Sequence, residues 1–235
     1  MIRRRSHPDS SVTTTRVAAY TDAVFAIAAT LLVLDLTTRS FGDLKSNADL
    51  ADALLDMWQP VLTFIVSFVI LSLMWTTHVA QFEWIARIDG PGMWINNIRL
   101  LFIVLVPFTS SLSTDYSHFL LGRILLPINF FFAILMSWMQ WGWAVRRREI
   151  LTPGLSAAEA RRGSGATLSA LIISAAVVVA SPWVGPWAFW LFLADGLLTR
   201  ALGGTPGVPG HERTADAGPA REDEGGAAPA PDPRP

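Results

Sequence analysis

The sequence predicts an all-α, polytopic membrane protein with six transmembrane helices. Hydrophobic residues make up 51% of the 235 residues and charged residues only 16%, whereas soluble domains carry about 25% charged residues. Six stretches are long and apolar enough, or nearly so, to cross a bilayer, which takes about 20 residues of helix. Arg and Lys are also unevenly shared between the connecting segments, and this asymmetry sets the topology of membrane proteins.

The six predicted spans are residues 18–36, 57–79, 93–112, 119–145, 166–181 and 187–202. The last two are short and are separated by Pro182 and Pro186, with Gly185 between them. Proline interrupts a helix and glycine permits a turn, so this spacing predicts a tight helical hairpin. A single re-entrant hairpin remains the alternative for this pair.

The basic residues predict that both termini are cytoplasmic. They gather in the N-terminal arm and in the loops after the second and fourth spans, at Arg3, Arg4, Arg5, Arg16, Arg87, Arg146, Arg147, Arg148, Arg161 and Arg162. The opposite side holds only Arg39, Lys45 and Arg123. Termini on the same side require an even number of spans, which favours six over five.

The chain then divides into a cytoplasmic arm (1–15), a six-helix transmembrane domain (16–202) and a tail (203–235). The tail is rich in Gly, Pro, Ala and charge, so we expect it to be disordered and cytoplasmic. The acidic loop 37–56 should face outside, and its last part should begin the second helix with Asn47 as the cap. Residues 1–15 are polar, so no cleavable signal peptide is expected.

Composition excludes several classes of function. With no cysteine in the chain, disulfides, thiolate metal sites and cysteine nucleophiles are excluded. The net charge of −1 argues against a nucleic-acid partner, which a basic face would attract. No His-x-x-x-His or Gly-x-Ser-x-Gly pattern supports a metal or serine site, and we expect no cofactor.

The first span is the most informative. It carries the ionisable residues Arg16 and Asp22, which are costly at membrane depth and point to a buried partner or a functional role. Ile27, Thr30, Leu31 and Leu34 follow the spacing i, i+3, i+4, i+7 and share one face of the helix. Spacing alone favours ordinary helix packing for this face. The many alanines of the span would let neighbouring helices approach closely.

Residues 16–22 read Arg-x-x-x-Tyr-Thr-Asp, with Tyr20 and Thr21 at its centre. This stretch resembles the Arg-x-x-x-Phe-Ser-Asp signature of the transmembrane protein 175 family of potassium channels, with two conservative departures. The stretches Trp-Thr-Thr-His at 75–78 and Trp-Ile-Asn-Asn-Ile-Arg at 94–99 are similar to the same family. The resemblance covers roughly residues 16–200.

The resemblance implies a six-helix subunit that assembles as a homotetramer around a pore lined by the central first helix. By motif position it makes Ile27 the hydrophobic constriction, Leu31 and Leu34 further apolar layers, and Thr30 a hydroxyl layer linked to potassium preference. The family lacks a carbonyl-lined Gly-Tyr-Gly filter, and none occurs here. Potassium would be the permeant ion, with no other metal or cofactor.

The resemblance also implies an interhelical polar network on the first three helices. Its expected members are Arg16, Tyr20, Thr21, Asp22, His78, Asn96, Asn97 and Arg99. We expect Asp22 to pair with Arg99 or to bond His78, although the family commonly has an apolar residue where Arg99 stands. Asp35, at the outer end of the helix, would attract cations when four copies surround an axis.

Two other classes of function stay open. A proton channel or proton-coupled transporter could use Asp22, His78 and Asp35, but no paired half-helices or repeats are visible. An intramembrane enzyme could use Asp22 and His78 or the pair Asp115 and His118, though the latter two suit a solvated outer loop better. A passive, potassium-selective or weakly selective cation channel is therefore the main hypothesis, and an enzyme is not expected.

Overall fold

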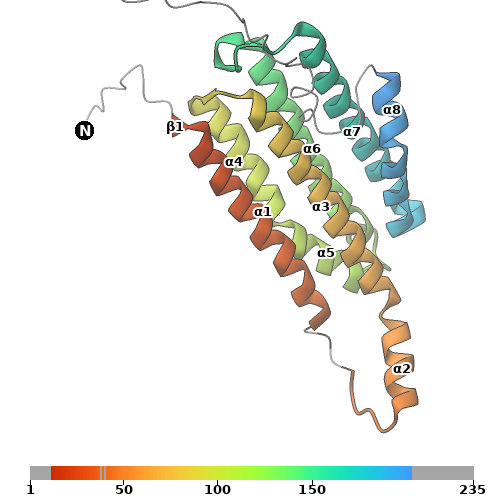
Figure 1. Cartoon of the computed structure of the whole chain (residues 1–235). Coiled ribbons are helices and arrows are strands. Elements are labelled where there is room, and N and C mark those ends of the chain that lie inside the picture. The colour runs from red at the N-terminus through yellow and green to blue at the C-terminus, as the bar shows by residue number, and fades with distance from the viewer. Residues whose placement is uncertain (1–11, 38, 40, 203–235) are drawn as a thin grey trace, which may run out of the picture.

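The computed structural model describes residues 12–37, 39 and 41–202. Its helices run side by side in an elongated bundle (Figure 1). In chain order, the elements are β1 (Val12–Thr13), α1 (Thr14–Thr37), α2 (Asn47–Asp56), α3 (Trp58–Trp84), β2 (Arg87–Ile88), α4 (Gly90–Val104), α5 (Val106–Asp115), α6 (Leu120–Arg146), η1 (Arg148–Ile150), α7 (Ala157–Val184), η2 (Gly185–Ala194) and α8 (Asp195–Ala201). The all-α membrane fold is confirmed.

The first four predicted spans are present with bounds that differ by a few residues. They correspond to α1, α3, α4 with α5, and α6, and each is long and apolar enough to cross a bilayer. The third span is not one straight helix, since α4 ends at Val104 and α5 begins at Val106. Pro107 lacks the N–H that an unbroken helix would need, and this accounts for the break.

The fifth and sixth predicted spans form one apolar segment, Ala157–Ala201, of 45 residues. It folds back at Gly185, whose φ of +58° favours glycine. Figure 1 shows α8 beside α7, and Ser169 of α7 donates to the carboxylate of Asp195 in α8 at 2.6 Å. The hairpin prediction therefore agrees with the structure.

Both arms of this hairpin are long enough to span a bilayer. The 28 residues of α7 extend about 42 Å at the usual α-helical rise. The second arm has fewer residues, but η2 is a 3-10 helix of 10 residues that rises about 2.0 Å per residue. With α8 it reaches about 30 Å, the thickness of the hydrocarbon core. These lengths favour two crossings over a re-entrant loop.

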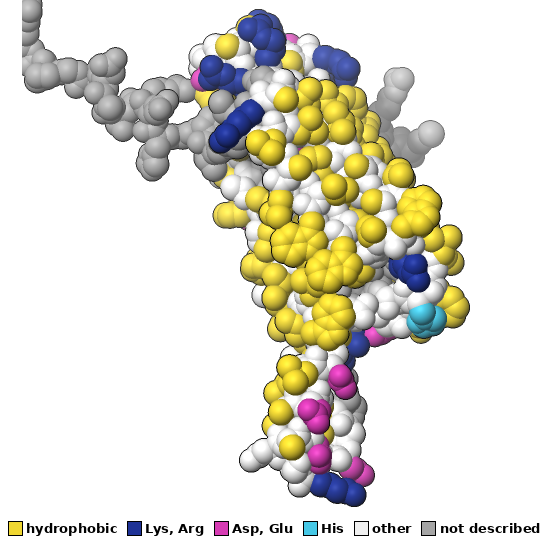
Figure 2. Space-filling view, turned by 90° about the vertical axis from the view of Figure 1, so that its right-hand side faces the viewer, with side chains coloured by type: hydrophobic (Ala, Val, Ile, Leu, Met, Phe, Trp, Pro, Cys, Tyr) yellow, Lys and Arg dark blue, Asp and Glu magenta, His cyan; other side chains and the backbone are white. Residues whose placement is uncertain are grey.

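Three connecting segments meet at one end of the bundle, which we call the basic end. There β1 pairs antiparallel with β2, so that Val12 faces Ile88. The segment after α6 joins them, because the Thr152 N–H donates to the Trp84 carbonyl at 2.9 Å and Arg147 forms an ion pair with Asp89. Arg and Lys side chains gather at this end in the view of Figure 2. The distribution of Arg and Lys in the sequence predicted that these three segments lie on the same side of the membrane.

Residues 12–15 of the predicted arm thus belong to the fold, as β1 and the start of α1. The predicted tail, 203–235, lies outside the described residues, as do residues 1–11.

At the opposite end, α2 projects beyond the bundle and buries no side chain (Figures 1 and 2). Its cap is Ser46 rather than the predicted Asn47: the Ser46 hydroxyl accepts from the Asp49 N–H at 3.1 Å. The Asp49 carboxylate in turn accepts from the Lys45 N–H at 2.9 Å. Hydrogen bonds to this carboxylate, first from the Lys45 N–H and then from Ser46, hold the pKa of Asp49 below its usual value. The helix is separate from α3 because the chain turns at Met57.

Candidate functional site: the exposed face of α1 and its polar anchors

One face of α1 is packed within the subunit. Its buried residues recur every three or four positions, at Val17, Thr21, Phe25, Ala28 and Leu32, and contact α3, α4 and α5. In Figure 1, α1 lies at one edge of the bundle. The helix is therefore not enclosed by the chain's own helices, and a central position for it requires further subunits.

The opposite face of α1 carries the stripe predicted to line a pore. Ile27 is 58% exposed, Leu34 50% and Leu31 39%, and Thr30 is also exposed. The Thr30 hydroxyl donates to the Ile27 carbonyl at 2.8 Å, so its hydrogen is used and its oxygen remains an acceptor. We call Ile27, Thr30, Leu31 and Leu34 the α1 stripe.

Tyr20 belongs with this stripe and not with the polar network. It is 58% exposed and stands seven residues before Ile27, so the two share a face of the helix. The family motif grouped Tyr20 with its neighbours in sequence. Helical periodicity was the signal that could have placed Tyr20 on the stripe face, apart from Thr21 and Asp22.

Thr21 and Asn96 form the buried part of the network. Asn96 of α4 donates through Nδ2 to the Thr21 hydroxyl at 2.9 Å, and both side chains are fully buried. The Asn96 Oδ1 atom has no hydrogen-bond partner among the described residues. This bond joins α1 to α4 through two uncharged groups.

Asp22 pairs with neither Arg99 nor His78, and that prediction was wrong. Its carboxylate accepts from the Trp75 Nε1–H of α3 at 2.9 Å, and both side chains are exposed. Consecutive helical positions are turned by about 100°. Because Thr21 faces the interior, Asp22 is carried round to the edge of the packed face, where Trp75 meets it.

His78 and Arg99 contact each other in the interior instead. Arg99 is 0% exposed and donates through Nη2 to the Met74 carbonyl at 2.9 Å, while its Nη1 lies 3.5 Å from His78 Nδ1. The guanidinium can only donate, so His78 Nδ1 must accept. The imidazole also contacts the Phe82 ring, which is tilted by 46° to it with ring centres 4.1 Å apart, and Arg99 lies over the Phe25 ring at 5.6 Å.

The other two predicted network members, Arg16 and Asn97, are exposed side chains of α1 and α4. The structure therefore divides the predicted network into three separate contacts: Thr21 with Asn96, Asp22 with Trp75, and His78 with Arg99.

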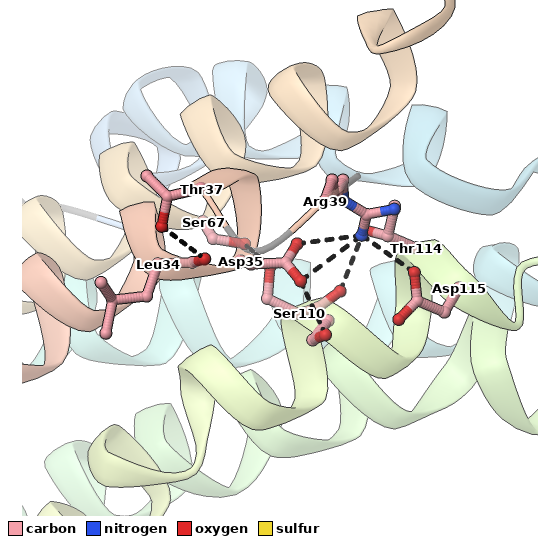
Figure 3. A network of polar contacts seen from close by, with 9 residues as sticks. Leu34, Asp35, Thr37, Arg39, Ser67, Ser110, Thr114 and Asp115 are labelled. Atoms are coloured by element: carbon pink, nitrogen blue, oxygen red, sulfur yellow. Dashed lines mark hydrogen bonds and ion pairs between the residues drawn. The ribbon is translucent and has the colours of Figure 1, made fainter. Parts of the chain in front are cut away.

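Asp35 lies in a second polar group at the far end of α1 (Figure 3). It accepts from the Ser111 hydroxyl at 2.7 Å and from Arg39 Nη2 at 3.2 Å. Arg39 also donates to Asp115 at 2.9 Å. Burial lowers the pKa of Arg39, but hydrogen bonds and charge attraction from the two carboxylates outweigh this and raise it, so Arg39 stays charged. Asp35 is thus bound to a cation of its own chain.

Sequence reasoning missed Arg39, which it counted only as a loop charge. The spacing of four residues from Asp35 was the available signal, since such pairs meet on a helical turn. The alternative enzymatic pair does not form: Asp115 binds Arg39, and the His118 ring contacts the tilted ring of Phe119, with centres 4.1 Å apart.

Residues 16–107 match the model of a family described as endosomal/lysosomal potassium channel TMEM175. A potassium channel of Chamaesiphon minutus is 35% identical over 103 residues, which cover 44% of this chain and 50% of that protein. A potassium channel of Streptomyces collinus is 34% identical over 101 residues, which cover 43% and 48%. The match therefore spans about half the length of these relatives.

The fold extends the likeness over more of the chain. A crystal structure of a lysosomal potassium-selective channel TMEM175 homologue from Chamaesiphon minutus matches with a TM-score of 0.53 and 26% identity, covering 77% of this chain and 97% of that one. A zebrafish relative, named an endosomal/lysosomal proton channel, is 27% identical over 47% of this chain and 21% of its own length. These relatives are named as channels and none of them as an enzyme, in agreement with the prediction that this chain is not an enzyme.

Proposed function

This chain is a multi-pass membrane protein that resembles the TMEM175 channels, and we propose that it is the subunit of a passive potassium channel. Four copies would surround an axis lined by α1, in a homotetramer set in the cell membrane. Both termini would be cytoplasmic, since the basic end carries the Arg-rich loops. Potassium ions are the proposed permeant, and no cofactor is required.

The observation that carries the proposal is the contrast between the two faces of α1. One face is packed against three helices of the subunit, whereas the α1 stripe remains 39–58% exposed at its apolar positions. Close packing of small residues around an axis suits a helix with six alanines between residues 18 and 29. Four stripes facing one another would form a narrow apolar ring at Ile27, with the Thr30 oxygens one turn away.

Such a ring can regulate conduction by excluding water. A hydrophobic constriction gates by dewetting, and hydroxyl oxygens can replace part of the hydration shell of a cation. The Thr30 oxygen is free to accept because its hydrogen is donated to the backbone. This chemistry favours weak selection among cations by hydroxyls and bound water.

The proton alternative lacks structural support for its predicted residues. Asp22 and His78 have separate partners, and within the described residues no hydrogen bond links them. His78 also accepts from a cationic donor, which an imidazolium could not do. Because the zebrafish relative is named a proton channel, proton flux is also measured in the test of this proposal.

The test is ion flux in liposomes that hold the purified chain under a potassium gradient. Potassium flux without any proton gradient is expected. Ile27→Asn should wet the constriction and raise cation leak about ten-fold or more. Val179→Asn is the matched control: Val179 is 65% exposed on α7, a helix that does not lie beside α1 in Figure 1, and its replacement should leave flux unchanged.

Three results would contradict parts of the proposal. Flux that needs a proton gradient would favour the transporter. Flux that is the same in Ile27→Asn and in the unaltered chain would remove Ile27 as the constriction. Two-dimensional class averages that lack four-fold symmetry would reject the tetramer.

A further inference from the structure

Arg99 is a buried cation whose partners are all uncharged. It is the largest fully buried side chain of the described residues, near the middle of the span formed by α4 and α5. The groups around its guanidinium are the Met74 carbonyl at 2.9 Å, His78 Nδ1 at 3.5 Å and the Phe25 ring at 5.6 Å. Among residues 12–37, 39 and 41–202, no carboxylate forms an ion pair with it.

This arrangement is costly and calls for an explanation beyond packing. A guanidinium stays protonated in proteins, so burial does not remove its charge. An ionisable side chain inside a membrane segment is by default a sign of function. A neutral side chain of similar length would fill the same space without the cost of removing a charge from water.

The position of Arg99 relative to the α1 stripe supplies the explanation. Its guanidinium touches Phe25 on the packed face of α1, and Ile27 lies on the exposed face two residues later. Two residues correspond to about 3 Å along the helix, so Arg99 lies at nearly the depth of Ile27. Only the width of α1, about 10–12 Å, separates the charge from the stripe.

We propose that Arg99 sets the cation conductance of the channel by placing a fixed positive charge behind the pore wall at the depth of Ile27. This inference rests on the proposed function of α1 as the pore helix. Four such charges around an axis lower the occupancy of cations in the constriction. The space between the charge and the pore is filled by protein and not by water, so the field is not weakened before it reaches the pore, where mobile ions can then screen it.

The experiment compares potassium flux through the unaltered chain with that of three variants in liposomes. Arg99→Met and Arg99→Gln remove the charge, and Arg99→Lys retains it. We expect the neutral variants to raise flux about three- to ten-fold and to shift the reversal potential toward a stronger preference for potassium over chloride. Arg99→Lys should stay close to the unaltered chain.

A buried polar group can also alter flux by loosening the fold, so a matched control is needed. Gln140 of α6 is equally buried, is neutral, and its two amide atoms have no partner among the described residues. Gln140→Met should leave flux and reversal potential unchanged. Arg99→Gln retains a donor for the Met74 carbonyl, so it decides the test if Arg99→Met does not give a single peak in gel filtration.

Ionic strength separates an electrostatic role from a structural one. The Debye length falls from about 30 Å at 10 mM salt to about 3 Å at 1 M, so salt in the pore should screen the Arg99 charge. The difference between the neutral variants and the unaltered chain should shrink as KCl rises over this range. A difference that is independent of KCl, or an equal increase in Arg99→Lys, overturns the inference.

These measurements distinguish a wrong role for Arg99 from a wrong assignment of the chain as a channel. If the unaltered chain conducts and a folded neutral variant behaves identically, Arg99 does not set conductance and the channel assignment stands. If neither the unaltered chain nor Ile27→Asn passes potassium, the channel assignment falls, and the role of Arg99 falls with it.

Discussion

The two ends of α1 are held by different chemistry. Near the basic end, Thr21 is joined to Asn96 by one hydrogen bond between uncharged groups that are shielded from water. At the other end, Asp35 and Asp115 share Arg39, whose side chain is 25% exposed, while that of Asp115 is 45% exposed. The first contact depends on desolvation, and the second on charges that water and salt can screen.

This difference predicts that the two contacts stabilise the fold by unequal amounts. An unsatisfied buried polar group costs the full desolvation penalty when its partner is removed, about 1–3 kcal/mol. Partly exposed ion pairs contribute about 0–1 kcal/mol. The half of α1 near the basic end, which also contacts Arg99 through Phe25, is therefore the more rigid part. The end of α1 that carries Asp35 is the part that is more easily displaced.

The largest effect is expected for Thr21→Val, which removes the acceptor of Asn96. The free energy of unfolding should fall by about 2 kcal/mol, since Asn96 Oδ1 already has no partner among the described residues. Thermal unfolding in detergent would measure it, and the loss should not vary with salt.

Thr167→Val is the matched control for this change. The Thr167 hydroxyl bonds only carbonyls of its own helix, at 3.1 and 3.2 Å, so its loss should cost less than half as much. A Thr21→Val variant as stable as this control would show that the buried bond does not anchor α1.

A smaller effect is expected for Arg39→Gln at the outer end. It removes both ion pairs but leaves Asp35 its bond from Ser111, so stability should fall by less than about 1 kcal/mol. The loss should disappear in about 1 M salt, where exposed charges are screened.

Arg123→Gln provides the comparison, because Arg123 donates to the Ser117 and Pro182 carbonyls at 2.8 and 2.9 Å. Its effect should be much less sensitive to salt. If the two variants respond alike to salt, the ends of α1 do not differ in the way described.

The smallest effect is expected for Asp22→Asn. The amide oxygen can still accept from Trp75, and the site is exposed, so stability should change by less than about 0.5 kcal/mol. Potassium flux in liposomes should persist, whereas a proton pathway through Asp22 would be blocked. Asp22→Ala, which removes the acceptor, serves as the comparison, and abolished flux in Asp22→Asn would contradict the separate roles of Asp22 and His78.

Much of the fold could be predicted, and less of the site. The spans followed from hydropathy, but the division of α4 from α5 and the fold-back at Gly185 shifted their bounds. Thr21 and Asn96 were predicted to share a network and do so. The family motif grouped Tyr20, Asn97 and Arg16 with them, yet a helix turns adjacent residues to different faces. For Arg39, the spacing of four residues from Asp35 was visible in the sequence, but its second partner, Asp115, lies 76 residues away and was not.

By itself, the sequence determined the membrane class, the approximate positions of the first four spans, and the residues that share the α1 stripe. The reason is that lipid demands long apolar helices with satisfied backbones, and helical periodicity groups residues without reference to neighbours. Only the tertiary structure decided which face of α1 is packed, which partner Asp22 takes, and that Arg99 is buried with no carboxylate partner among the described residues. Those outcomes depend on how helices distant in sequence are rotated against one another, which no local pattern encodes.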